Sequence, residues 1–570
     1  MRSTLTTLKA LTVLAMLSCV LVAGAHAAVE DCLPADATAV IKVTDLGAHY
    51  GQFAAGPLAA KLRDPSFLPD VAAGIQQAEN SVKEFEQAQG VDAEDVVLRV
   101  LGREFALAAF PDETAVVVAE GDTAQSIRGA VEEFLRVEGA TGELTGLDSA
   151  DYKGTEIHIA ALRTKTRYHA LSGRVLAVSE SRSAVQRVID VIAGDAPALS
   201  SSEQYREATR AVPGNAVGCS YVGGALLEHC AEKVAQDAAS EPRPARGKAG
   251  GRAFKAALAE TLGAAEFATL ALTGDDALRL HLSVSYKDGR LPPRLHALLP
   301  EPGAGLDILD TVPPEAAIAV ARNVNLQGAW NVLVETMDSG GVRAEAALEG
   351  IVAMVGGVES REQFFDELGG QAALFVLPGA RHGTPPAVAL VARLRSTDHI
   401  PEAIESIVGA VVYFARASGK QDVSLTKAEH SGTTVSTVRV EKPGPWKNLS
   451  PSFFLLDNQL VLTTSADAAE RIIEASSARR PRPEADLTDG TVFVRGFARA
   501  GQLRSMLAEH RDFLVQHAAE KNGKTRDTAR HELEALGKLL SLVEDVRWAG
   551  SFSQGRTDHV LIIRAADAAQ

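Results

Sequence analysis

Residues able to do covalent or metal chemistry occur in this chain, but their spacing completes no catalytic motif. A serine nucleophile elbow requires Gly-x-Ser-x-Gly, and the nearest match, Ser551-Phe552-Ser553-Gln554-Gly555, lacks the first glycine. His531-Glu532 begins like a zinc-protease helix, but Ala535 stands where the second histidine should come. His229 and Cys230 are two neighbouring metal ligands, whereas a zinc site needs three or four. The sequence therefore predicts no catalytic residue, no metal site and no cofactor.

Carboxylate pairs are the one catalytic arrangement that spacing does not exclude. The chain has 73 Asp and Glu residues, and two carboxylates from distant segments suffice for acid–base hydrolysis when they meet in a cleft. Most of them fall on the solvent-facing sides of expected helices. An extracytoplasmic hydrolase with a site assembled from both halves of the chain is therefore the alternative to a non-enzymatic protein.

Cysteines offer a structural cross-link. Cys32, Cys219 and Cys230 follow the N-terminal leader. Cys219 lies in an expected strand and Cys230 in the helix expected after it, so a short disulfide between them can form in an oxidising compartment. The alternative is that both are small buried thiols. The sequence leaves the pairing and the redox state of Cys32 open.

Two basic islands interrupt the acidic background. Their members are Arg243, Arg246, Lys248 and Arg252 in the first, and Arg479, Arg480 and Arg482 in the second. Such islands can contact an anionic surface, such as lipid head groups, envelope polysaccharide or an acidic protein. The alternative is that both are solvated linkers.

The composition excludes several classes of protein. The chain has 570 residues, 46% of them hydrophobic and 23% charged, as is typical of globular proteins with a large core. Lys and Arg number 57 against 73 Asp and Glu, which gives a net charge of -16. A chain this acidic is not expected to bind nucleic acid, which requires a basic surface.

The N-terminus has the features of an export signal. Arg2 and Lys9 precede an apolar run over residues 10–24, and Ala25-His26-Ala27 follows with the small residues that signal peptidase accepts. The apolar run is too short for a comfortable membrane span. We expect cleavage after Ala27, a mature chain without a transmembrane segment, and a location outside the cytoplasm, either periplasmic or secreted.

The rest of the chain consists of two copies of one pattern, offset by roughly 270 to 280 residues. The matched pieces are Leu33 to Ala37 with Val312 to Ala316, Leu101 to Leu107 with Leu368 to Leu374, Gly154-Thr155 with Gly432-Thr433, Leu171 to Ile189 with Leu455 to Ile473, and the terminal strand pairs Phe267 to Leu272 and Leu278 to Tyr286 with Val546 to Phe552 and Val560 to Ile563. Five matches in the same order indicate a duplication. The domains expected are a signal peptide over 1–27, a first repeat over 28–290, a proline-rich linker over 291–305 and a second repeat over 306–570.

Within each copy, short strands alternate with helices. The clearest strand runs from Leu278 to Val284, where every second residue is Leu or Val and the residues between are Arg, His and Ser. This alternation is typical of an antiparallel sheet with one apolar face, which helices would cover. We predict an α+β fold with two similar lobes, each a largely antiparallel sheet covered by helices.

The opening Leu33 to Ala37 and the helix end at Leu101-Gly102 resemble a family of uncharacterised exported bacterial proteins, a domain of unknown function with these hallmarks. The second copy departs from the opening, with Val312 and Pro314 in place of leucine and alanine. The resemblance implies export and the α+β class. It supplies neither catalytic residues nor a substrate.

Three functions follow as hypotheses. The duplication and the incomplete catalytic motifs favour a non-enzymatic envelope protein that binds a protein or another envelope partner between or on its two lobes. The hydrolase described above is the alternative. A structural or chaperone-like role is the third, and exposed apolar surfaces in the fold would favour it.

Overall fold

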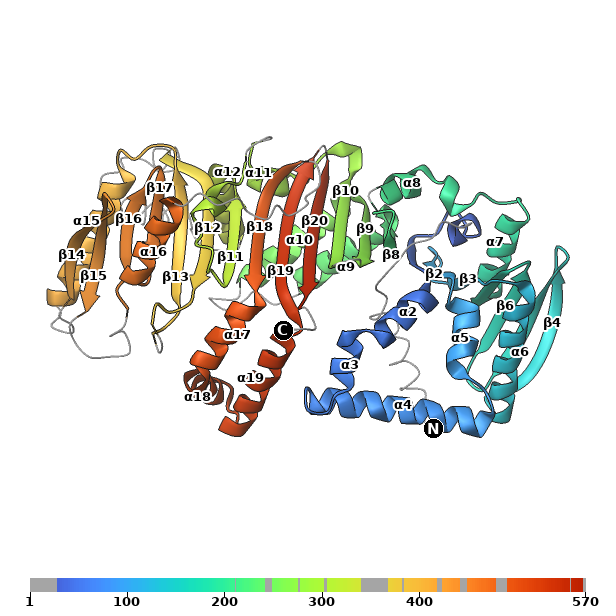
Figure 1. Ribbon diagram of the computed structural model, residues 1–570. Coiled ribbons are helices and arrows are strands. Elements are labelled where there is room, and N and C mark those ends of the chain that lie inside the picture. Colours follow the sequence, from blue (N-terminus) through green and yellow to red (C-terminus); the bar gives the residue numbers. More distant parts are fainter. Residues whose placement is uncertain are drawn as a thin grey trace. The chain divides into compact units, whose positions relative to one another are not determined.

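A computed structural model of the chain describes residues 28–210, 212–240, 249–274, 277–301, 305–339, 367–381, 384–417, 423–440, 449–477, 490–553 and 555–566. These residues form two compact units (Figure 1). The first unit contains residues up to 232 together with 262–287, and the second contains 233–261 together with the residues from 288 onward. Both units combine helices with antiparallel strands, which confirms the predicted α+β class.

The strands of the first unit form one antiparallel sheet. They are β1 (Ala39–Thr44), β2 (Glu104–Ala109), β3 (Ala115–Glu120), β4 (Leu144–Tyr152), β5 (Thr155–Leu162), β6 (Thr166–Ser172), β7 (Val175–Ser179), β8 (Ala216–Gly223), β9 (Ala265–Gly274) and β10 (Leu278–Tyr286). Their order in the sheet is β10-β9-β8-β1-β2-β3-β7-β6-β5-β4. The first strand in sequence therefore lies inside the sheet, between β2 and β8.

Helical elements of the first unit pack on both faces of this sheet and leave part of one face exposed. The helical elements are η1 (Val29–Asp31), α2 (Leu46–Ala55), α3 (Pro57–Arg63), α4 (Pro69–Gln89), α5 (Ala93–Leu101), α6 (Ala124–Ala140), α7 (Arg182–Ile192), η2 (Leu199–Ser201), α8 (Glu203–Arg210) and α9 (Gly224–Ser240), the last of which continues into the second unit. The helices α7 and α8 and the 3-10 turn η1 pack on the strands. Between them lies the main core, which includes Leu33, Val118, Ile157, Val188 and Leu199.

The second unit has a sheet of the same strand order. Its strands are β11 (Ile318–Asn323), β12 (Leu368–Leu377), β13 (Ala387–Leu394), β14 (Val423–His430), β15 (Thr433–Val440), β16 (Ser452–Leu456), β17 (Gln459–Thr463), β18 (Thr491–Arg499), β19 (Val543–Ser553) and β20 (Arg556–Ala565). They pair antiparallel in the order β20-β19-β18-β11-β12-β13-β17-β16-β15-β14. Each strand of the second unit thus occupies the same position in its sheet as the strand of the first unit whose number is lower by ten, so that β11 corresponds to β1.

The helical elements of the second unit also pack on both faces of its sheet. They are α10 (Ala249–Ala264), whose last residues belong to the first unit, η3 (Lys287–Gly289), which begins there, α11 (Pro293–Leu298), η4 (Ile308–Thr311), α12 (Leu326–Ser339), α15 (Ile400–Ala417), α16 (Ala466–Ser477), α17 (Ala500–Glu509), α18 (Arg511–Asn522) and α19 (Arg526–Leu540). Helix α16 and the turn η4 contact the sheet strands. The core beneath them includes Ile308, Phe375, Leu377, Val391 and Ile472.

Local signals in the sequence explain where several helices begin. Asp92 accepts a hydrogen bond from the N–H of Asp95 at the start of α5, and Ser181 accepts one from Ala184 at the start of α7. In the second copy, the spacing of Ser360 and Gln363 predicts a capping box for the matching helix, and both residues lie outside the described residues. Within the proline-rich segment 291–305, α11 starts at a proline, whose fixed φ suits a first helical turn.

The polarity of β10 is the reverse of the expectation. Ser283 is 5% exposed on the covered face, whereas Leu282 is 39% exposed on the other face. The register between β9 and β10 decides this, because it places Ser283 opposite the buried Thr269. The prediction that helices would cover the apolar side of this strand is wrong.

Candidate functional site

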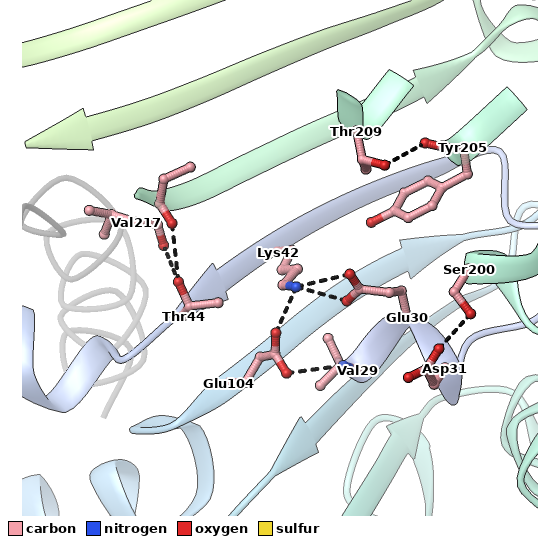
Figure 2. Close-up of polar contacts among 11 residues, drawn as sticks. Val29, Glu30, Asp31, Lys42, Thr44, Glu104, Ser200, Tyr205, Thr209 and Val217 are labelled. Carbon is pink, nitrogen blue, oxygen red and sulfur yellow. Dashed lines mark hydrogen bonds and ion pairs between the residues drawn. The ribbon is translucent and has the colours of Figure 1, made fainter. Parts of the chain in front are cut away.

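A lysine and two glutamates meet on the covered face of the first unit (Figure 2). Lys42 lies on β1, Glu104 on the neighbouring β2, and Glu30 in η1. The Nζ of Lys42 is 3.0 and 2.8 Å from the two carboxylate oxygens of Glu30 and 2.7 Å from Oε1 of Glu104. The Oε2 of Glu104 accepts a hydrogen bond of 3.0 Å from the backbone N–H of Val29. We call Glu30, Lys42 and Glu104 the charged triad.

The surroundings of the triad fix the charge of its lysine. Burial by itself lowers the pKa of Lys42, but the attraction of Glu30 and Glu104 outweighs burial and raises that pKa above its ordinary value. Burial raises the pKa of Glu104, and the hydrogen bond from Lys42 offsets only part of the rise. Lys42 is therefore an ammonium at neutral pH. An ammonium has no lone pair with which to attack a substrate or accept a proton.

The nucleophiles around the triad are held protonated as well. Burial, reinforced by Asp31, raises the pKa of Cys32 to about 11. Burial also raises the pKa of Cys219 to about 11, and it raises the pKa of Tyr205. Since the thiolate is the reactive form of cysteine, neither thiol is activated. What the triad does is attach η1 to β1 and β2.

The second unit makes the same attachment without the charges of the triad. At matching strand and register positions, the counterparts of Glu30, Lys42 and Glu104 are Leu309, Ala321 and Gln371. The N–H of Ile308 in η4 donates to Oε1 of Gln371 at 3.2 Å, as Val29 donates to Glu104. Ala321 and Leu309 are buried where the first unit has charges. The strand arrangement therefore does not require the triad, which is a feature of the first unit alone.

A third carboxylate lies beside the triad. Glu120 on β3 is directly opposite Glu104 in the register of β2 and β3, and it is 4% exposed. Arg174 contacts Oε1 of Glu120 at 2.6 Å, whereas Oε2 has no hydrogen-bond partner among the described residues. Like charges directly opposite on neighbouring strands repel each other. The triad and Glu120 together set three carboxylates against two cations, Lys42 and Arg174.

Aliphatic side chains form a row on the face of the first sheet that lies opposite its main core. The register places Leu282, Leu270, Ser220, Ile41, Leu107, Val117 and Val178 side by side on β10, β9, β8, β1, β2, β3 and β7. Ile41 is 45% exposed although its strand lies inside the sheet. We call these seven residues the first aliphatic row.

The second unit carries a row at the same positions. It consists of Leu561, Trp548, Gly496, Val320, Leu374, Leu390 and Leu462. Leu374 is 45% exposed. A Cβ at Gly496 would come within 2.3 Å of the Trp548 ring, so the glycine is what lets the indole lie across β18. We call these residues the second aliphatic row.

The two cysteines that the sequence suggests as a disulfide lie where it places them, Cys219 on β8 and Cys230 on α9. The structure has both as free thiols, together with Cys32. Cys219 faces Lys42 across the register of β1 and β8, while Cys230 is exposed. The structure therefore gives no support to the disulfide between them.

The basic islands are almost entirely outside the described residues. Arg243, Arg246, Lys248, Arg479, Arg480 and Arg482 all lie there. Arg252 belongs to helix α10. Contact between these islands and an anionic surface stays a prediction.

Neither the triad nor the rows were among the residues that sequence reasoning selects. A lysine in the middle of an otherwise apolar strand was the available signal for the triad. The alternation from Leu278 to Val284 was the signal for the row, but it indicated a covered face. Among the described residues, no group of three or more His, Cys, Asp or Glu side chains is arranged to hold a metal ion. In the same part of the chain, no helix has both the length and the apolar character needed to cross a membrane.

Comparison with known proteins identifies a family and no individual relative. No curated protein and no solved structure matches the chain. The family described as protein of unknown function (DUF3352) matches residues 130–480, a span that starts within α6 and includes parts of both units. The match covers more than half of the 570 residues. The chain therefore belongs to the DUF3352 family of proteins of unknown function.

Proposed function

We propose that this chain is an exported, non-enzymatic envelope protein that binds lipid acyl chains on the exposed parts of the sheet faces opposite the main cores of two similar lobes. The observation that carries the proposal is the aliphatic row, which recurs at the same register positions in both units. Exposed apolar surfaces of this kind are rare in monomeric proteins unless they contact another molecule.

The chemistry of the first row favours an aliphatic partner over a protein. Apart from Ser220, the first row is made of Ile, Leu and Val, and it contains no charged side chain. Backbone amides in the interior of a sheet are hydrogen-bonded to the neighbouring strands, so the face offers almost no hydrogen bonds to a partner. Protein interfaces are enriched in aromatic residues and arginine, which this row lacks. An acyl chain, which has no polar group along its length, matches such a surface.

The length of a row also suits an acyl chain. Neighbouring strands lie about 4.8 Å apart, so seven strands span about 29 Å from the first to the last. One leaflet of a bilayer contributes about half of a hydrocarbon thickness of about 30 Å. A chain of that length fits on a row with room to spare. Each buried methylene contributes about 0.8 kcal/mol to binding.

The identical strand orders support the duplication that the sequence predicts. So does the repeated hydrogen bond from a 3-10 turn to β2 or β12, from Val29 to Glu104 and from Ile308 to Gln371. Export rests on the basic, apolar and small-residue segments before Ala28. The protonated Lys42 and thiols of the first unit support a non-enzymatic role.

A binding experiment with a fluorescent 16-carbon fatty acid tests the proposal. The chain from Ala28 onward should bind two molecules, one per unit. Ile41→Asp should abolish the first site and Leu374→Asp the second, each reducing the stoichiometry from two to one. Both residues are 45% exposed, so neither change should destabilise the fold by more than about 1 kcal/mol.

Two control variants place the same aspartate on exposed leucines outside the rows, Leu147→Asp on β4 and Leu536→Asp on α19. They should leave the stoichiometry at two. No binding by the unmodified chain, or equal loss in the control variants, would overturn the proposal. Crosslinking of a protein from the intact envelope through a photoreactive group at Ile41, without fatty acid binding, would assign the row to a protein partner instead.

A further inference from the structure

The carboxylates in and beside the charged triad outnumber the neighbouring cations by one. Glu30, Glu104 and Glu120 face Lys42 and Arg174. Glu120 is 4% exposed, and its Oε2 has no hydrogen-bond partner among the described residues. A buried carboxylate oxygen without a donor is costly, so its environment is suited to a further positively charged donor.

Ala28 is the residue immediately before η1. Its neighbour Val29 donates its N–H to Glu104 at 3.0 Å, and η1 packs on both β2 and β3. Ala28 has an extended backbone. Bond lengths keep its nitrogen within about 4 Å of the Val29 nitrogen. The Ala28 nitrogen therefore lies within about 7 Å of Oε2 of Glu104, which stands opposite Glu120 in the register of β2 and β3.

The second unit shows an ion pair between the corresponding positions. Asp307 precedes Ile308 as Ala28 precedes Val29, and Arg393 on β13 takes the place of Glu120 on β3. The guanidinium of Arg393 contacts the carboxylate of Asp307 at 3.0 Å. The residue before the 3-10 turn is thus within ion-pair reach of this strand position. In the first unit, β3 carries the negatively charged Glu120, and Ala28 has no charged side chain that could pair with it.

We infer that the α-ammonium group of Ala28, created by cleavage after Ala27, binds the carboxylates of Glu120 and Glu104 and completes the charge balance of the first unit. The inference rests on the export that we propose above. It makes the processed amino terminus a structural ligand of the fold. A chain that retains residues before Ala28 has a neutral amide at this place and cannot form the ion pair.

The reactivity of the amino terminus tests the ion pair. A chain that begins at Ala28, released in vitro from an N-terminal fusion, is compared with one that carries a Gly-Ser extension, so that no side chain changes. An α-amino group has an ordinary pKa of about 7.7–8.0, and pairing with a carboxylate raises it. Reductive methylation at pH 7.5 should therefore be at least about tenfold slower at Ala28 than at the extended terminus, since one pKa unit is a tenfold change in the free amine.

Two variants assign the effect to the carboxylate. Glu120→Gln should bring the methylation rate at Ala28 up to that of the extended chain, while Glu180→Gln, at an exposed glutamate of the same unit, should leave the rate slow. Equal rates at Ala28 and at the extended terminus would overturn the ion pair. Mass spectrometry of the exported protein tests the other premise, because a mature chain that begins at a residue other than Ala28 would overturn the proposed cleavage and leave the rate comparison as a separate result.

Discussion

Removing the lysine of the charged triad should destabilise the first unit far more than removing the whole triad. Lys42→Ala leaves Glu30 and Glu104 buried without the ammonium that contacts both at 2.7 to 3.0 Å. Deleting one partner of a buried ion pair costs about 3–5 kcal/mol, because the other charge stays buried. The side chain of Lys42 keeps some solvent exposure, so we expect a loss of about 3 kcal/mol.

The triple variant Glu30→Leu, Lys42→Ala, Glu104→Gln introduces the residues that the second unit has at these positions. It leaves no buried charge in the triad and keeps an acceptor for the N–H of Val29. Replacement of a buried ion pair by packed neutral residues is often neutral or stabilising. We expect the triple variant to stay within about 1 kcal/mol of the unmodified protein, although it contains the destabilising substitution.

The two units can be followed separately in one denaturation experiment. Trp330, Trp446 and Trp548 all belong to the second unit, so tryptophan fluorescence does not report on the first. Far-UV circular dichroism reports on both. Lys42→Ala should move the circular dichroism transition to lower urea concentration and leave the fluorescence transition in place. Hydrogen exchange of β1 and β2 peptides gives the free energy of opening at the site.

The pH dependence of Lys42→Ala has a definite sign. Burial already raises the pKa of Glu104, and loss of the ammonium raises it further. The folded state then binds more protons than the unfolded chain, so stability increases as pH falls from 7 toward the ordinary carboxylate range. The deficit should shrink on acidification. A loss below about 1 kcal/mol for Lys42→Ala, or a triple variant that is less stable than the single one, would refute this account of the triad.

Three further predictions concern other parts of the fold. Gly496→Val should destabilise the second unit by about 1–3 kcal/mol, measured by tryptophan fluorescence in urea, because a Cβ there meets the Trp548 ring at 2.3 Å. Burial lowers the pKa of His169 to about 4, so the unfolded chain binds a proton on this histidine at a higher pH than the folded chain does. Stability is therefore lost as pH falls from about 6.5 through about 4, and His169→Gln should flatten this part of the stability–pH curve. Cys230, which is exposed, should react with iodoacetamide at pH 7 well before Cys219, whose thiol has a pKa of about 11, as stepwise mass increments would show.

Much of the fold could be predicted because its signals are local. Asp92 and Ser181 cap helices that begin one residue later, and the terminal strand pairs appear as β9 with β10 and β19 with β20. Alternation and caps need only a few neighbouring residues. They identify elements, and the repeated order of elements then indicates two similar sheets.

The sites could not be predicted in the same way because they depend on register. Glu30, Lys42 and Glu104 come from three elements, and only the pairing of β1 with β2 brings Lys42 and Glu104 to one face. The side of β10 that is covered likewise depends on its pairing with β9, since alternation shows that the two sides differ and not which side faces the helices. For this reason Ser283 is buried and Leu282 is exposed, which is the reverse of what the sequence predicts.

The position of β1 between β2 and β8 has a consequence for synthesis. Ala39 pairs with Ala109 on one side and with Val222 on the other, so a growing chain has the second partner only after most of the unit has been made. Until then one edge of β1 is bare, and bare edges recruit other strands. A charged residue in the middle of such a strand opposes that recruitment. We therefore expect Lys42 to oppose aggregation of the nascent polypeptide, in addition to its contacts with Glu30 and Glu104 in the folded unit.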